Sequence, residues 1–147
     1  MLRYQAIESL KGRYLGRFPR GGDILEALTN LCRREDVRLG RVEAIGAVER
    51  ARIGYYDQQA QEYQFMEIDR PLEITSLVGN VSLRDGEPFV HAHITLADRD
   101  GRVYGGHLAP GTIAFACEFM VEALDGRSLE RSFDDETGLF LWDLPTR

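Results

Sequence analysis

The stretch PFVHAHITLADRDGRVYGGHL, residues 88–108, contains all three histidines of this 147-residue chain and a turn signal between two apolar segments. Residues two apart in a β-strand point to the same face, so His91 and His93 share one face and the aliphatic residues that alternate with them share the other. The aliphatic face is the better candidate for the core. The pattern therefore predicts a strand over residues 89–97 that carries two imidazoles outside the core.

The turn at residues 99–101 decides where the third imidazole lies. If it is a three-residue loop that ends in a left-handed glycine, Asp98 pairs with Arg102. Counting outward along both strands then places His107 opposite His93. Directly opposed residues have Cβ atoms about 4.5 to 5.5 Å apart, so the three imidazoles converge on one point.

A four-residue loop would give a different result, because a shift of one residue turns every side chain to the other face. His107 would then lie opposite Ala92, unless Gly105 and Gly106 form a compensating bulge. These two glycines have a second possible use. Without a Cβ atom they let a backbone segment or a ligand approach closely, which makes both candidate ligand-binding positions.

Three neutral imidazoles suit zinc, iron, nickel or copper better than magnesium or calcium. Three protein ligands leave a fourth position for water or substrate, and zinc in such a site can activate water near neutral pH. His91, His93 and His107 are therefore predicted to bind zinc, or another transition metal such as iron or nickel. The alternative is that the histidines face solvent or form ordinary hydrogen bonds.

Two further residues are candidates for binding or catalysis. Glu118 is a candidate general base for a metal-dependent hydrolase, since it lies on the mixed face of the segment after the histidine hairpin. Arg17, in the basic stretch GRYLGRFPRGG, is a candidate contact for a small anionic ligand. The simpler alternatives are a solvated or ion-paired Glu118 and a solvated arginine surface.

The rest of the chain predicts an α+β fold in one domain over residues 1–147, with mostly antiparallel strands and one main helix that packs on the sheet. Asp23 is expected to cap the helix within residues 21–36. Residues 112–124 are compatible with a helix or a strand, and we favour a strand with Ile113, Phe115, Cys117, Phe119 and Val121 on one face. Further strands are expected at 4–10, 13–18, 41–57 (bent or split near Gly46), 62–68, 72–83 and 102–108.

Composition limits the functions that fit. The chain has 44% hydrophobic and 29% charged residues and a net charge of -6, and this charge disfavours direct binding to a nucleic-acid backbone. No segment is apolar enough for a membrane helix or a secretion signal, which predicts a cytoplasmic protein. Cys32 and Cys117 are expected to be buried thiols. The apolar tail, residues 134–147, must dock on its own subunit or on a neighbour.

Several stretches together resemble one known family, the PPC domain (plants and prokaryotes conserved). They are GGDILEAL, IGAVERARIGYYD, the strand that carries Glu118, and LEITSLVGNVSLRDGEPFVHAHITLADRDGRVYGGHL. The resemblance covers nearly the whole chain. The domain occurs alone in bacteria and archaea and behind AT-hooks in plant nuclear proteins.

The resemblance implies a strongly bent, mostly antiparallel sheet with one main flanking helix, assembly as a homotrimer, and zinc binding by His91, His93 and His107. Family members often carry a DNA-binding label, but an AT-hook needs an R-G-R-P-like core, and this sequence has none. Three hypotheses follow. The first is a trimeric metal-binding domain whose open site binds a small anion or supports hydrolysis. The second is a DNA-associated or transcription-associated protein, and the third is an assembly module in which the metal only staples the hairpin.

Overall fold

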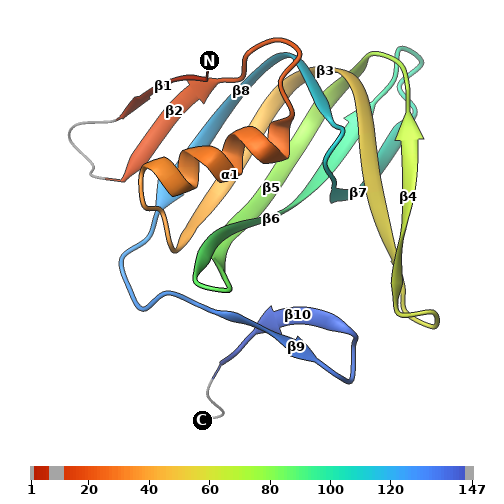
Figure 1. Ribbon diagram of the computed structural model, residues 1–147. Coiled ribbons are helices and arrows are strands. Elements are labelled where there is room, and N and C mark those ends of the chain that lie inside the picture. The colour runs from red at the N-terminus through yellow and green to blue at the C-terminus, as the bar shows by residue number, and fades with distance from the viewer. Residues whose placement is uncertain (1, 7–11, 145–147) are drawn as a thin grey trace.

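The computed structural model describes residues 2–6 and 12–144, which form one curved antiparallel sheet, one α-helix and a small C-terminal hairpin (Figure 1). The eight-stranded sheet has the order β1-β2-β8-β3-β5-β6-β7, with β4 paired to β3. This architecture confirms the predicted α+β class. The elements are β1 Arg3–Ala6, β2 Arg13–Arg17, α1 Ile24–Arg34, β3 Gly40–Asp57, β4 Glu62–Ile68, β5 Leu72–Arg84, β6 Glu87–Ala97, β7 Val103–Leu108, β8 Ile113–Ala123, β9 Arg131–Asp134 and β10 Leu139–Trp142.

The bend of the sheet is concentrated in β3, the longest strand. Its first half pairs with β5 and β8, and its second half pairs with β4 and β7. The path β5-β6-β7 therefore begins and ends on β3, and the sheet curls on itself. The pairing with β5 shifts at Gly46, which has φ +129°, and a Cβ atom there would lie 2.2 Å from the carbonyl oxygen of Ala116. The bend predicted near Gly46 is confirmed.

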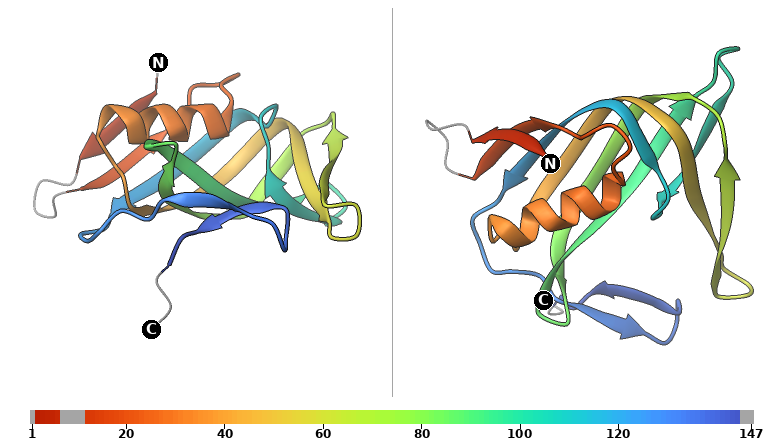
Figure 2. Two further views of the ribbon diagram at one scale, coloured as in Figure 1. Left: turned by 60° about the horizontal axis from the view of Figure 1, so that its bottom comes forward. Right: turned by 45° about the horizontal axis from the view of Figure 1, so that its top comes forward.

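The helix α1 lies against the concave side of the sheet (Figures 1 and 2). Asp23 caps it as predicted, because its carboxylate accepts a hydrogen bond of 3.0 Å from the backbone N–H of Glu26. The apolar stripe of the helix is buried against the sheet. Cys32 and Cys117 are buried and free, as expected, and burial raises the pKa of the Cys32 thiol to about 12. No helix in the described part of the chain could span a membrane.

The segment after the histidine hairpin is the strand β8, as favoured, but its predicted faces are partly wrong. Cys117, Phe119 and Val121 share one face of the strand and are buried. Phe115, however, is 48% exposed, and Ala114 is buried in its place. The pairing of β8 with β3 shifts between Ala47 and Val48, and this irregularity reverses the alternation of side chains.

The C-terminal tail docks on its own subunit through the β9–β10 hairpin. The backbone N–H of Leu83 at the end of β5 donates to the carbonyl oxygen of Leu129 at 2.8 Å. The guanidinium of Arg131 on β9 donates to the Ser82 hydroxyl, also at 2.8 Å. Both contacts lie just before the predicted tail. The tail itself touches its own subunit where the Tyr56 hydroxyl donates to the carbonyl oxygen of Thr137. Leu141 and Trp142 nevertheless stay 40% and 38% exposed, so the prediction that the tail buries its apolar surface holds only in part. The last part of the predicted tail, 145–147, and residues 7–10 of the predicted first strand lie outside the described residues.

Candidate metal centre

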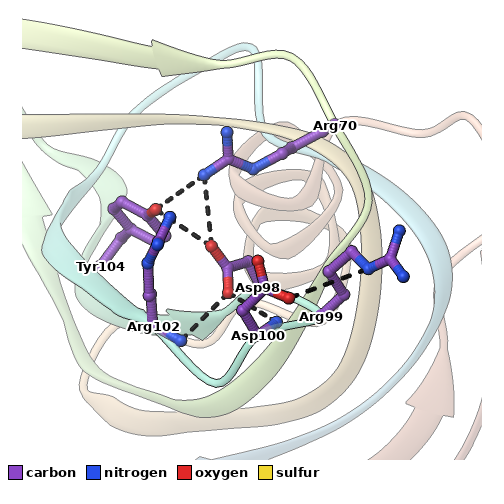
Figure 3. Close-up of polar contacts among 6 residues, drawn as sticks. All are labelled: Arg70, Asp98, Arg99, Asp100, Arg102 and Tyr104. Carbon is purple, nitrogen blue, oxygen red and sulfur yellow. Dashed lines mark hydrogen bonds and ion pairs between the residues drawn. The ribbon is translucent and has the colours of Figure 1, made fainter.

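The turn between β6 and β7 is held by the carboxylate of Asp98 (Figure 3). It accepts hydrogen bonds from the backbone N–H groups of Asp100 (2.9 Å) and Arg102 (3.0 Å). The hydroxyl of Tyr104 also donates to it, at 3.1 Å, and Arg70 forms an ion pair with it at 3.4 Å. Desolvation raises the pKa of Asp98, but these hydrogen bonds and the arginine outweigh it, so the pKa lies below its ordinary value. The turn is therefore built around an ionised carboxylate.

This turn sets the register that the site requires. The backbone N–H of Asp98 donates to the carbonyl oxygen of Arg102, and Gly101 is left-handed with φ +76°. The loop therefore has three residues, as the first prediction assumed. His93 and His107 are direct cross-strand partners, and no bulge between them is needed.

Replacing Asp98 with alanine is expected to loosen this turn. The variant loses the acceptor for two backbone N–H groups and one hydroxyl, so the melting temperature should fall by about 5 °C or more. Calorimetry or circular dichroism measures the change. Asp100→Ala is the matched control, because the one described partner of the Asp100 carboxylate is the exposed Arg99, at 4.0 Å. Equal melting temperatures for the two variants would contradict the role given to Asp98.

The three imidazoles gather at one point on the side of β6 that faces away from the core. The ring centroids lie 5.2 Å apart for His91 and His93, 5.0 Å for His91 and His107, and 5.8 Å for His93 and His107. One potential ligand atom from each lies within 4.8 Å of the other two. Ligands of one tetrahedral zinc ion lie about 3.4 Å apart, so small rotations of the rings would bring all three onto an ion.

The environment of His107 shows that the donor set fits a metal ion. Its Nδ1 atom is buried and has no hydrogen-bond partner among the described residues. Buried polar atoms in proteins are almost always paired, so an unpaired imidazole nitrogen beside two other imidazoles is the kind of atom that a metal ion would satisfy.

Burial also controls the charge of the site. It lowers the pKa of His91 to about 4, with further contributions from His107, Arg131 and His93. Burial likewise lowers the pKa of His107, and His93 and Arg131 contribute. Both imidazoles are therefore neutral at pH 7, which is the form that binds metal ions.

The metal-free protein is expected to lose stability as the pH falls from 6.5 to about 4. His91 gains a proton near pH 6.5 in the unfolded chain but only near pH 4 in the folded protein, so the unfolded state binds more protons in this window. The contribution of His91 to the free energy of unfolding is therefore fully present above pH 6.5, and it is lost as the pH falls toward 4. Urea unfolding at a series of pH values measures the slope. His91→Gln should give a shallower slope, and identical slopes would contradict the assignment.

Two residues that border the centre were not predicted from the sequence. Gly54 on β3 is the cross-strand partner of His107, and the ring of Tyr63 on β4 lies 4.9 Å from the His107 ring. A Cβ atom at Gly54 would lie 3.2 Å from the Tyr63 ring, so this glycine makes room for both rings. Nothing in the sequence indicated these two residues, because the pairing of β3 with β7 joins segments about 50 residues apart. No local pattern reveals such a contact.

The two predicted glycines lie in the centre. Gly106 lets β7 approach β3, because a Cβ atom there would lie 2.6 Å from the carbonyl oxygen of Gly54. Gly105 is exposed on the strand face that carries His107. Gly106 therefore has a packing role, whereas ligand binding at Gly105 stays a prediction.

Glu118 and Arg17 lie elsewhere in the subunit. Glu118 is exposed on β8, three strands from β6, which corresponds to about 14 Å along the sheet. Arg17 on β2 is its cross-strand partner and lies one strand farther away. Both line a separate hollow of about 570 Å³. The structure therefore brings the three histidines and the two glycines together, but not these two side chains.

The chain belongs to the family of the Plants and Prokaryotes Conserved (PCC) domain, whose model matches residues 6–125. It is 42% identical to a metal-containing protein from Archaeoglobus fulgidus, with a TM-score of 0.85 and 97% of each chain covered. It is 26% identical to a "putative dna binding protein" from Bacteroides thetaiotaomicron, with a TM-score of 0.89 and 97% of each chain covered. The resemblance found in the sequence is confirmed.

A curated relative has a different organisation. The chain is 34% identical over 116 residues to the bifunctional protein GlmU of a Synechococcus strain. The match covers 78% of this chain but only 17% of that protein. The chain thus corresponds to a small part of a much longer relative.

Proposed function

We propose that this protein is a metal-binding domain in which His91, His93 and His107 hold a transition metal ion, with zinc as the first choice and iron or nickel as alternatives. The observation that carries the proposal is the buried, unpaired Nδ1 atom of His107 beside two other imidazoles. The similarity to a metal-containing archaeal protein supports it. When bound, the ion supplies a Lewis acid with an open coordination position for a small anion or for hydrolysis.

Metal analysis of the purified protein tests this proposal. The protein should contain about one equivalent of a transition metal, and chelator-treated protein should regain it from Zn²⁺ with a dissociation constant below about 1 µM. The competing ions Fe²⁺ and Ni²⁺ identify the preferred metal. Chelator-treated protein that takes up none of the three ions would overturn the proposal.

We further propose that residues 1–147 form one domain that assembles as a homotrimer. The outer face of the sheet exposes the apolar side chains of Leu15, Ile45, Val78 and Met120, which come from four adjacent strands. Apolar side chains clustered in this way favour burial in an interface. Sedimentation equilibrium should give the mass of three chains, and Ile45→Glu should give single chains.

Glu118 lies beside this apolar patch. Since it is about 14 Å from the histidines of its own subunit, it can act as a general base only on a centre held by a neighbouring subunit. A hydrolytic activity that survives in Glu118→Gln would exclude that role. An activity lost in monomeric Ile45→Glu protein would support it.

The second candidate is DNA binding, which is favoured by the name of the Bacteroides relative. The net charge of -6 argues against it. If DNA is a partner, A·T-rich duplex should bind at physiological ionic strength with an affinity that falls steeply with salt.

The third candidate is an assembly module in which the ion only staples the hairpin to β3. A staple needs a closed shell of four protein ligands, whereas the cluster of potential ligands among the described residues contains three. The available ligands therefore favour an open site. X-ray absorption spectroscopy of the metal-loaded protein counts the ligands and separates the two arrangements.

A further inference from the structure

We infer that Arg131 on β9 is an anion-binding residue of the histidine centre, and that it selects a small oxyanion with a carboxylate or phosphate group. The inference rests on the metal site proposed above and adds a residue from outside the matched part of the family, which ends at residue 125. It also differs from the expectation that Arg17 binds the anion.

The first observation is a buried charge without a counter-ion. Arg131 is only 9% exposed, and it forms no ion pair with a carboxylate in the described part of the chain. Its Nε, Nη1 and Nη2 atoms donate to the Ser82 hydroxyl, the Phe140 carbonyl oxygen and the Asn80 side-chain oxygen, all of which are neutral. A buried cation is costly unless an anion balances it. This position therefore favours an anionic ligand.

The second observation places this cation beside the histidines. Arg131 donates to the side chain of Asn80 at 3.0 Å, and Asn80 is the direct cross-strand partner of His91. The guanidinium carbon also lies 5.3 Å from the ring centroid of Phe89, which is two residues before His91 and on the same strand face. The guanidinium is therefore a neighbour of the first imidazole of the centre.

The hairpin that carries Arg131 is anchored on both sides of the centre. At one end it is joined to β5 through Arg131 itself. At the other end, the hydroxyl of Tyr56 near the tip of β3 donates to the carbonyl oxygen of Thr137 at 2.6 Å. The side-chain amide of Gln61 donates to the backbone carbonyl oxygen of Glu136 at 3.0 Å. The hairpin lies beside the β5–β6 turn and the β3–β4 tip (Figure 1). These contacts fix the position of the hairpin and therefore of the Arg131 guanidinium.

The Arg131 guanidinium and the proposed metal ion together determine which ligand fits. A guanidinium has five N–H donors, and the three bonds above leave two of them for a ligand. Carboxylate and phosphate groups match this planar donor pattern. A phosphate has further oxygens for the open position of the metal, and a carboxylate oxygen that accepts one N–H group still has a second lone pair for it. One small oxyanion can therefore neutralise the arginine and complete the metal coordination together. A neutral ligand would leave the buried charge uncompensated.

A purely structural role is the alternative, in which Arg131 only fastens the hairpin to β5. The test uses the full chain loaded with Co²⁺, whose visible absorption reports both metal binding and changes in coordination. Sodium acetate and inorganic phosphate are titrated separately into wild type, Arg131→Met and Arg131→Lys. Arg84→Met is the matched control, because the Arg84 guanidinium lies 3.6 Å from the Phe140 ring of the same hairpin and carries the same charge.

Wild type should bind at least one of the two anions with a change in the cobalt spectrum, and Arg131→Met should bind it about 10- to 100-fold more weakly. Arg84→Met should stay within about threefold of wild type. Arg131→Lys keeps the positive charge but loses the planar pair of N–H donors, so its affinity for the anion should fall at least about threefold. If Arg131→Met does not fold, the affinity of Arg131→Lys tests the inference instead.

Three results would overturn the inference. The first is an Arg131 variant that folds and binds the anions as tightly as wild type. The second is a cobalt-loaded wild type whose spectrum responds to neither anion, and the third is equal weakening in Arg84→Met. Failure of the metal site itself is distinguishable, because wild type would then give no cobalt spectrum before any anion is added.

Discussion

The His93→Ala variant is expected to bind Zn²⁺ at least about 100-fold more weakly than wild type. His93 is the imidazole paired across the hairpin with His107, and only two ligands remain without it. Wild type should gain about 2.7 kcal/mol of stability at a free Zn²⁺ concentration 100 times its dissociation constant, and the variant should gain almost none at that concentration. Thermal unfolding with and without Zn²⁺, together with competition against a chelating dye, measures both effects.

The fold should tolerate this change, because the His93 side chain is exposed. Thr95→Ala is the matched control, since Thr95 is the next residue on the same face of β6 and its hydrogen bond from Thr75 uses the backbone carbonyl oxygen. The control should bind Zn²⁺ as wild type does. Unchanged Zn²⁺ affinity in His93→Ala would refute the metal centre.

The Gly79→Ala variant is expected to lose both stability and metal affinity. Gly79 lies on β5 opposite Ala92, between the two histidines of β6. A Cβ atom at position 79 would lie 2.3 Å from the carbonyl oxygen of His91 and 2.7 Å from the Cα atom of Ala92. These are backbone atoms, so β6 must move, and we expect a loss of about 3 kcal/mol in the free energy of unfolding. Urea unfolding and Zn²⁺ titration measure the two losses.

Gly105→Ala is the control for this variant. Gly105 borders β6 from the other side, and the nearest atom to a Cβ there is the carbonyl oxygen of Ile94 at 3.3 Å. That variant should lose less than about 1 kcal/mol, because a shift of a few tenths of an ångström relieves the contact. If both variants were equally stable, the close approach of β5 and β6 at Gly79 would not be what positions the histidines.

Local patterns in the sequence predicted much of the fold. Asp23 and the apolar stripe behind it identified the helix, since capping and helical periodicity act within a few turns. The loop at residues 99–101 predicted the pairing of His93 with His107, because a short turn fixes the register of its own hairpin. Family resemblance added the overall architecture.

Long-range pairing decided the features that local patterns could not reveal. The irregular pairing of β8 with β3 turned Phe115 to the surface, although strand alternation placed it with the buried residues. The strand order separated Glu118 and Arg17 from the histidines. The exposure of Phe115 and the distance of Glu118 and Arg17 from the histidines depend on pairing with other strands. Local sequence patterns therefore could not predict them.

A hairpin is a local structure, so the turn at residues 99–101 and the alternation within residues 88–108 are enough to predict that the three imidazoles meet outside the core. The surroundings of the imidazoles depend instead on pairing between distant strands. Gly54 and Tyr63 reach His107 because β3 curls back onto β7, and Arg131 reaches Asn80 because the C-terminal hairpin returns to β5. These contacts join segments about 50 residues apart, and such contacts depend on how the whole sheet closes.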